Sequence, residues 1–184
     1  MELDQALTAR DRADAKDRAT TGEVRAAYEN LRRLSALVPL CSTCTVTMTV
    51  PADPAVIPIV TDGVVELLEE RAWAKEDVLA IQLALQEAVA NAIRHGCRGD
   101  VSKQVRCSVS CDDSGEVVIV VRDPGSGFDP GAIADPLDTA NILKPSGRGI
   151  FLIKELMDHV QFADGGREVQ MRKTKAPDLS PASR

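Results

Sequence analysis

Hydrophobic residues follow alternating spacing in some blocks of the chain and helical spacing in others. Residues 44–50, "CTVTMTV", alternate apolar with polar positions and are rich in β-branched side chains, which predicts a strand. Residues 59–73 and 75–96 then show the spacing of two amphipathic helices. Gly96 is expected to end the second helix, because glycine readily adopts the conformation that closes a helix.

The second half of the chain adds strands, a loop and a further helix. Residues 101–111 and 117–123 predict strands joined by the turn "DDSGE", and the later strand is apolar on both faces, as a central strand would be. Residues 124–146 lack periodicity and predict a loop. A helix over 149–160 and a hairpin over 160–174, turning at "DGG", complete the pattern.

Strands joined by short turns, with helices gathered between them, predict an α+β fold. The expected architecture is a two-layer α/β sandwich with helices on one face of a mixed, mostly antiparallel sheet. We expect a helical arm over 1–43, one domain over 44–174 and a disordered tail over 175–184. Apolar residues of the arm form a helical seam that fits either packing on the domain or a dimer contact: Val24, Ala27, Leu31, Leu34 and Val38.

Composition narrows the class of protein. The chain has 184 residues, 44% hydrophobic and 27% charged, which is typical of a soluble globular domain. Its net charge of -6 disfavours nucleic-acid binding, for which a basic surface is expected. No run approaches the roughly 18 apolar residues of a membrane span, and the N-terminus has no apolar signal core. We therefore expect a cytoplasmic protein that binds neither nucleic acid nor membrane directly.

Five cysteines are an odd number, which fits a secreted disulfide framework poorly. Cys41 and Cys44 form a CxxC motif, which is at most half of a zinc site. Cys107 and Cys111 lie on one face of a predicted strand, about 13 Å apart if the strand is regular, so both cannot bind one metal. Structural thiols are therefore favoured over a metal or redox role.

Two polar residues interrupt the apolar helix over 75–96. Glu87 and Asn91 are four residues apart, so they lie on one face of the helix, in a stripe with Ala84 and His95. Such residues can be solvated surface positions, or they can line a binding site.

Two glycine-rich segments lie where regular structure is predicted to break. Asp123 ends the apolar strand, and Gly125 and Gly127 after it permit tight backbone turns. Gly147 and Gly149 precede a helix N-terminus, whose free backbone N–H groups favour an anion such as phosphate. Taken singly, these segments are equally well explained as a turn and a helix entry.

Together and in this order, the three segments resemble a known family. "EAVAN", "DPGSGF" and "GRGIFLI" resemble the N, G1 and G2 boxes of the GHKL ATPase superfamily. "LQEAVANAIRHG" and "SGRGIFLIKELMDHVQF" look most like the bacterial anti-sigma-factor serine kinases of the RsbW and SpoIIAB type. The resemblance covers residues 45–174 and implies a Bergerat-type ATP-binding fold; the arm has no counterpart in it.

The resemblance implies roles for the polar side chains and the first glycines. Asn91 would hold Mg²⁺, which prefers hard oxygen ligands and would take its others from ATP phosphates and water. Glu87 would be the general base that deprotonates the attacking hydroxyl. Asp123 would accept a hydrogen bond from the adenine amino group, and Gly125 and Gly127 would let the backbone approach the base.

It also implies a phosphate-binding segment and a lid. Gly147, Arg148 and Gly149 would hold phosphate oxygens, and residues 128–146 would form the ATP lid, with Lys144 a candidate cation. Magnesium-ATP would then lie along the polar stripe of the helix, with room left for it by Ala84 and Ala88.

By the same resemblance, the protein is a homodimeric serine/threonine kinase. It would hold a sigma factor or analogous regulator inactive and phosphorylate a STAS-domain antagonist, which a PP2C-type phosphatase resets. One alternative is a non-catalytic module that sequesters a partner, although such a module has no need of Glu87. Another is the ATP domain of a split histidine kinase. The two histidines of the chain, His95 and His159, both fall inside the ATP-binding region, so a separate protein would have to provide the phosphoacceptor histidine.

Overall fold

The computed structural model describes residues 22, 43–129 and 148–175. The apolar seam of the arm, most of the expected lid with Lys144 and Gly147, and the tail from residue 176 fall outside the described residues. What the sequence predicts for them stays a prediction, as does the division into 1–43, 44–174 and 175–184.

Five strands form one sheet in the order β1-β2-β3-β5-β4. Their bounds are Thr43–Pro51 for β1, Gln104–Asp112 for β2, Glu116–Arg122 for β3, His159–Ala163 for β4 and Glu168–Thr174 for β5. The two-layer α+β fold is confirmed, and β3 has the central position that its apolar sequence predicts.

The expectation of a mixed sheet is wrong, because every neighbouring pair of described strands is antiparallel. Two helices separate β1 from β2, so the chain reverses direction three times and β2 runs antiparallel to β1. β4 runs parallel to β3, as a strand after a single helix would. However, β5 lies between them and pairs antiparallel with both.

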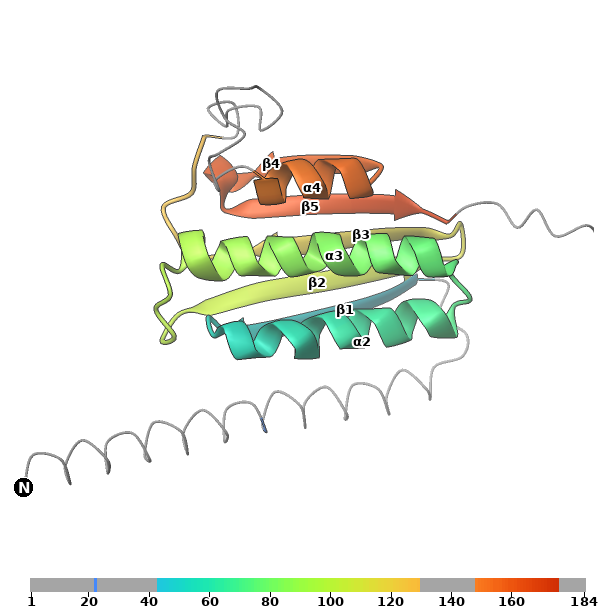
Figure 1. Cartoon of the computed structure of the whole chain (residues 1–184), viewed down its shortest axis with the longest axis horizontal. Coiled ribbons are helices and arrows are strands. Elements are labelled where there is room, and N and C mark those ends of the chain that lie inside the picture. Colours follow the sequence, from blue (N-terminus) through green and yellow to red (C-terminus); the bar gives the residue numbers. More distant parts are fainter. Residues whose placement is uncertain (1–21, 23–42, 130–147, 176–184) are drawn as a thin grey trace, which may run out of the picture. The chain divides into compact units, whose positions relative to one another are not determined.

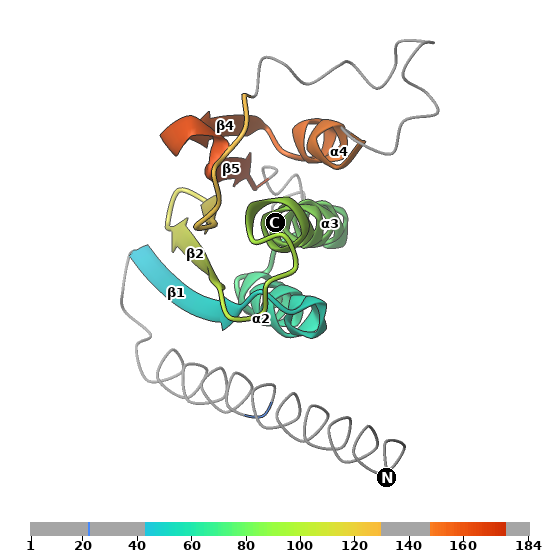
Figure 2. The same ribbon diagram turned by 90° about the vertical axis from the view of Figure 1, so that its left-hand side faces the viewer.

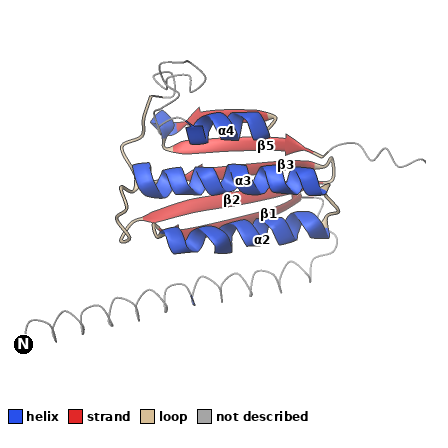
Figure 3. Cartoon of the chain, in the orientation of Figure 1, coloured by secondary structure: helices blue, strands red, loops and turns tan. Residues whose placement is uncertain are grey.

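The α-helices of the described residues cover one face of the sheet (Figures 1 and 2). They are α2 (Ile57–Glu70), α3 (Lys75–Asn91) and α4 (Arg148–Leu156). Figure 3 shows α3 lying along the middle of the sheet, between α2 and α4. None of the described helices is long and apolar enough to cross a membrane.

The core fills the space between the helices and the sheet. Along β2 every second residue from Val105 to Cys111 is buried, which is the pattern of a strand with one covered face. On α2 the buried Val60, Val64 and Leu68 repeat every four residues and point toward the same layer. Cys107 is fully buried there, and burial raises the pKa of its thiol to about 12.

Several element boundaries differ from the sequence pattern by a few residues, and the backbone explains two of them. The α-helical part of α3 ends at Asn91, and the chain continues as a wider π-helical turn, η2 (Ala92–Gly96). The backbone N–H of Cys97 accordingly bonds the carbonyl of Ala92, 2.8 Å away. Near the other end of the chain, α4 stops at Leu156, since the N–H of Asp158 already bonds Arg172 of β5, at 3.0 Å.

Candidate active site

The first turn of α4 lies directly on the polar residues of α3. A Cβ atom built on Gly149 would lie 2.6 Å from Oε2 of Glu87 and 3.2 Å from Nδ2 of Asn91. Real Cβ atoms essentially never come as close to another atom as the first distance. A Cβ atom at residue 149 would therefore force the Glu87 carboxylate to move, and the fold brings together the first and third of the segments that stand out in the sequence.

The N-terminus of α4 supplies an anion-binding element beside this contact. The first N–H groups of a helix have no partner within it, and its dipole favours negative charge there. No acidic side chain occupies the first turn of α4. Arg148 begins the helix and is exposed, whereas Gly147 lies outside the described residues.

Glu87 and Asn91 are half-buried, whereas two alanines of the same helix are buried. Ala84 is fully buried and Ala88 is 3% exposed. The expectation that these two alanines leave room for a ligand is wrong, because protein atoms already cover both. Their small size instead permits close packing within the helix layer.

Asp123 follows β3 and is half-buried. Its Oδ1 accepts a hydrogen bond from the N–H of Gly125 at 2.8 Å, and its own N–H bonds the carbonyl of Arg167 at 3.0 Å. Burial raises the pKa of this carboxyl; the Gly125 N–H and the positive charges of Arg167 and Lys103 oppose that rise. A half-buried carboxylate with a perturbed pKa is a reasonable place to expect ligand recognition.

The segment after Asp123 packs tightly against the end of η2. A Cβ on Gly96 would lie 2.1 Å from Cγ of Asp123, and one on Gly125 would lie 2.4 Å from the carbonyl oxygen of Gly96. Sequence reasoning treated Gly96 only as the end of a helix. Its contact with Asp123 depends on how η2 meets the sheet, for which the local sequence carries no signal.

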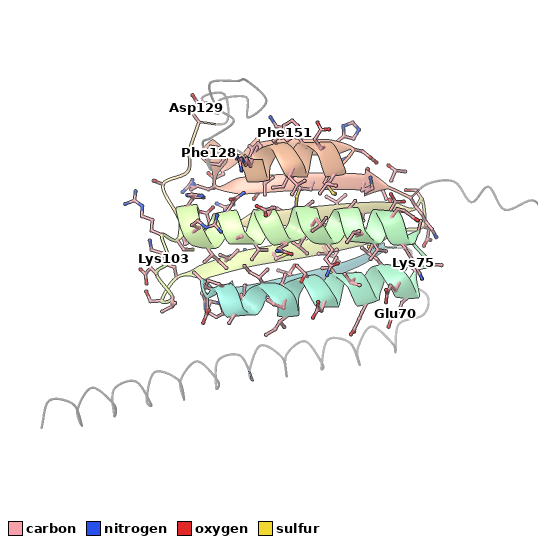
Figure 4. The ribbon with its side chains drawn as sticks, viewed as in Figure 1. Glu70, Lys75, Lys103, Phe128, Asp129 and Phe151 are labelled. Atoms are coloured by element: carbon pink, nitrogen blue, oxygen red, sulfur yellow. The ribbon has the colours of Figure 1, made fainter. Side chains whose placement is uncertain are left out.

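The other side of this segment meets the turn between β4 and β5, η4 (Asp164–Gly166). Gly127 has a φ of 75°, and a Cβ there would lie 2.0 Å from the carbonyl oxygen of Gly165. Phe128 follows near the start of α4 (Figure 4), with its ring edge-to-face on Phe162 and the centroids 5.4 Å apart. In the sequence, "DGG" indicates only a hairpin turn, so this neighbour of the site was missed.

The candidate residues thus form two groups connected by η2. Glu87, Asn91 and Gly149 form the first group, and Asp123 with its two glycines forms the second. From Asn91 to Gly96 the chain advances five residues, which make up the single wide turn η2. The two groups therefore lie near the same end of the helix layer, on the side where residue 129 leads into the undescribed segment (Figure 4).

A family model of the histidine kinase-like ATPase domain matches residues 50–173, which include the end of β1, all of β2, β3 and β4, and β5 except for its last residue. The chain belongs to the histidine kinase-like ATPase family. The three segments that form the two groups all lie within the matched range, so the family match and the site concern the same part of the molecule.

Within this family, the chain resembles serine-protein kinases named RsbW. The protein of that name from Bacillus licheniformis is 31% identical over 137 residues, which span 67% of this chain and 81% of the relative. The Staphylococcus epidermidis protein is 33% identical over 107 residues, which span 53% of this chain and 66% of the relative.

A solved structure has the same fold. The crystal structure of the RsbU and RsbW domains of a Mycobacterium tuberculosis protein superposes with a TM-score of 0.52 at 19% identity. The match covers 73% of this chain and 33% of the longer one. At that identity the likeness concerns the fold alone.

The donor atoms of the first group fit magnesium held jointly with a nucleotide. Asn91 and Glu87 offer hard oxygen atoms of the kind that Mg²⁺ prefers. Among the described residues, no group of three or more His, Cys, Asp or Glu side chains could hold a metal ion. These residues therefore suit an ion that takes most of its ligands from phosphate and water, and they do not suit a metal site made by protein alone.

Proposed function

We propose that the protein is a serine/threonine kinase that binds magnesium-ATP along the C-terminal half of α3. The observation that carries the proposal is the contact of Gly149 with Glu87 and Asn91. It places a carboxylate, an amide and a helix N-terminus together, and phosphoryl transfer needs little more than positioning, a proton acceptor and charge neutralisation. The similarity to serine-protein kinases supports the same activity.

Each group then has a defined task. The Asn91 amide oxygen would hold the metal, and the N–H groups of the first turn of α4 would bind phosphate oxygens. Glu87 would accept the proton of the attacking hydroxyl. Asp123 would accept a hydrogen bond from the adenine amino group. Magnesium-ATP, when bound, supplies the phosphoryl group and neutralises the charge that develops on it.

The partners proposed for the kinase follow from its relatives. The phosphoacceptor would be a serine or threonine on a STAS-domain antagonist, and the bound regulator would be a sigma factor or an analogue. A PP2C-type phosphatase would reverse the phosphorylation. The similarity to serine-protein kinases named RsbW supports this partner-switching circuit. A homodimeric kinase is part of the same proposal.

The experiment is phosphate transfer from labelled ATP to a purified STAS-domain protein of the same organism. Glu87→Gln preserves the size of the side chain but removes the proton acceptor, so we expect the transfer rate to fall about 100-fold or more while ATP affinity stays within a few fold. The matched control is Glu155→Gln, which neutralises an exposed carboxylate on α4 and should leave the rate unchanged.

Two results would contradict the proposal in different ways. If Glu87→Gln still phosphorylates the acceptor at the wild-type rate, the assignment of Glu87 as the base is wrong. If the wild type binds ATP but transfers no phosphate to any STAS-domain protein, the protein is a sequestering module instead.

A further inference from the structure

The turn between β4 and β5 holds both ends of the segment that carries Asp123. The N–H of Asp123 bonds the carbonyl of Arg167 at 3.0 Å, and the N–H of Phe128 bonds the carbonyl of Gly165, also at 3.0 Å. The six residues from 123 to 128 are thus fixed to one turn at their first and last members.

Close packing leaves this segment little freedom to move relative to the turn. Gly166 is buried, and a Cβ on it would lie 2.2 Å from the carbonyl oxygen of Phe128 and 2.8 Å from its nitrogen. Its neighbour Gly165 is exposed, and a Cβ there would meet nothing within 4 Å. Both glycines have positive φ, 63° at Gly165 and 82° at Gly166, so they share a backbone requirement and differ in what surrounds them.

Charged side chains brace the turn from the sheet. Asp164 pairs with Arg122 through one carboxylate oxygen and with Arg167 through the other. Arg122 also approaches Glu168 at 3.5 Å. All four side chains are partly exposed, and exposed pairs contribute little to stability, so this network matters more for where the turn lies than for how stable the domain is.

We infer that the turn Asp164–Arg167 is a positioning element of the nucleotide site: it sets where Asp123 and the backbone of Gly125 and Gly127 lie, and so determines the affinity for the base. The inference rests on the proposed function, and it goes beyond it by assigning a role to residues outside the three segments. Within the described part of the chain, the turn meets the site at the Asp123 segment. Its effect should therefore concern the adenine end of the ligand and spare the phosphate end.

The test compares Gly166→Ala with Gly165→Ala by calorimetric titration of magnesium-ATP and, separately, of magnesium tripolyphosphate, which has no base. Titrations are made where circular dichroism shows both variants fully folded. We expect Gly166→Ala to weaken ATP binding tenfold or more and Gly165→Ala to weaken it less than threefold. Tripolyphosphate affinity should stay within twofold in both variants.

A second pair of variants serves if Gly166→Ala does not fold. Asp164→Asn removes both charge pairs of the turn while asparagine tolerates the φ of 51° found there. We expect it to weaken ATP binding three- to fivefold without changing tripolyphosphate affinity. The control, Glu116→Gln, removes an ion pair with Arg172 elsewhere on the sheet and should change neither affinity.

The outcomes separate the inference from the function on which it rests. Wild-type protein that binds no ATP contradicts both. If the wild type binds ATP, equal ATP affinities of the two alanine variants contradict the inference alone. Equal affinities of Asp164→Asn and its control do the same. Equal losses for ATP and tripolyphosphate would also overturn it, because they would indicate a general disturbance of the fold.

Discussion

The surroundings of Asp123 are unfavourable for a charged carboxyl in the folded protein and suit the ligand role that we propose for it. Its carboxyl is partly withdrawn from water, which raises its pKa, and only one of its oxygens receives a hydrogen bond from the segment that follows. A carboxylate in this setting costs stability when it is charged and gains from a ligand that donates a hydrogen bond to it. Functional sites commonly contain such residues.

Replacing Asp123 with asparagine should therefore separate stability from binding. Because the folded-state pKa is raised, the carboxyl contributes stability below its unfolded pKa and loses that contribution as the pH rises through the folded value. Asp123→Asn keeps an oxygen that can accept the hydrogen bond from the Gly125 N–H, and its amide does not ionise in this pH range. We expect its unfolding free energy, relative to the wild type, to increase from pH 4 to pH 7 in urea titrations, while ATP affinity at pH 7 falls about tenfold.

The control for this comparison is Asp113→Asn, which changes an exposed aspartate in the turn between β2 and β3. It should leave ATP affinity at pH 7 unchanged. A trend of opposite sign in Asp123→Asn would mean that the charged carboxylate stabilises the fold.

At the scale of elements, the decisive relation is that of α4 to α3. α4 packs alongside α3, and its first turn meets Glu87 and Asn91 at a glycine, so the helix N-terminus and the polar stripe lie together. The wider turn η2 then carries the chain from Asn91 to the Asp123 segment. Such π-helical turns occur often at functional sites, since they change which way the following residues face.

A double-mutant cycle tests the contact between the two helices. Alanine is ordinarily more stable than glycine within a helix, by roughly 0.5–1 kcal/mol. In the wild type, Gly149→Ala should instead reduce the unfolding free energy by about 1–3 kcal/mol, because its Cβ meets the Glu87 carboxylate. In a Glu87→Ala background the carboxylate is gone, and the same substitution should become neutral or stabilising.

Chemical denaturation of the four proteins gives the coupling free energy. Equal effects of Gly149→Ala in the two backgrounds would show that α4 does not rest on Glu87 in solution.

At the scale of the whole molecule, bound nucleotide should stabilise the whole ATP-binding domain. The two groups of residues proposed to bind it come from both halves of the chain. Magnesium-ATP at 100 times its dissociation constant should raise the unfolding free energy by about 2.7 kcal/mol. Magnesium alone should change the melting temperature little, because the described residues hold no cluster of metal-binding side chains.

Thermal melts of the wild type and Asn91→Ala, with ATP in the presence and absence of magnesium, check this prediction. The wild type should gain stability from ATP mainly when magnesium is present, and Asn91→Ala should lose that dependence. Strong stabilisation of the wild type by magnesium without nucleotide would contradict the shared coordination proposed here.

Much of this architecture could be predicted from local pattern. The strands and helices follow from the spacing of apolar residues, and Glu87, Asn91 and Asp123 stand out because they interrupt it. The errors fall where distant segments decide the outcome. The sheet is antiparallel because β5 lies between β3 and β4, and Ala84 and Ala88 are covered by packing in the helix layer.

By itself, the sequence determined the secondary-structure elements and the order of the candidate residues along them, because side-chain type, periodicity and glycine content act over a few neighbouring positions. Only the tertiary structure decided which of them meet. Gly149 rests on Glu87, Gly96 faces Asp123, and the turn at Gly165 and Gly166 closes on Phe128. These contacts join segments far apart in the chain, and they arise when the helices and strands bury their apolar faces together, a process that no local pattern records.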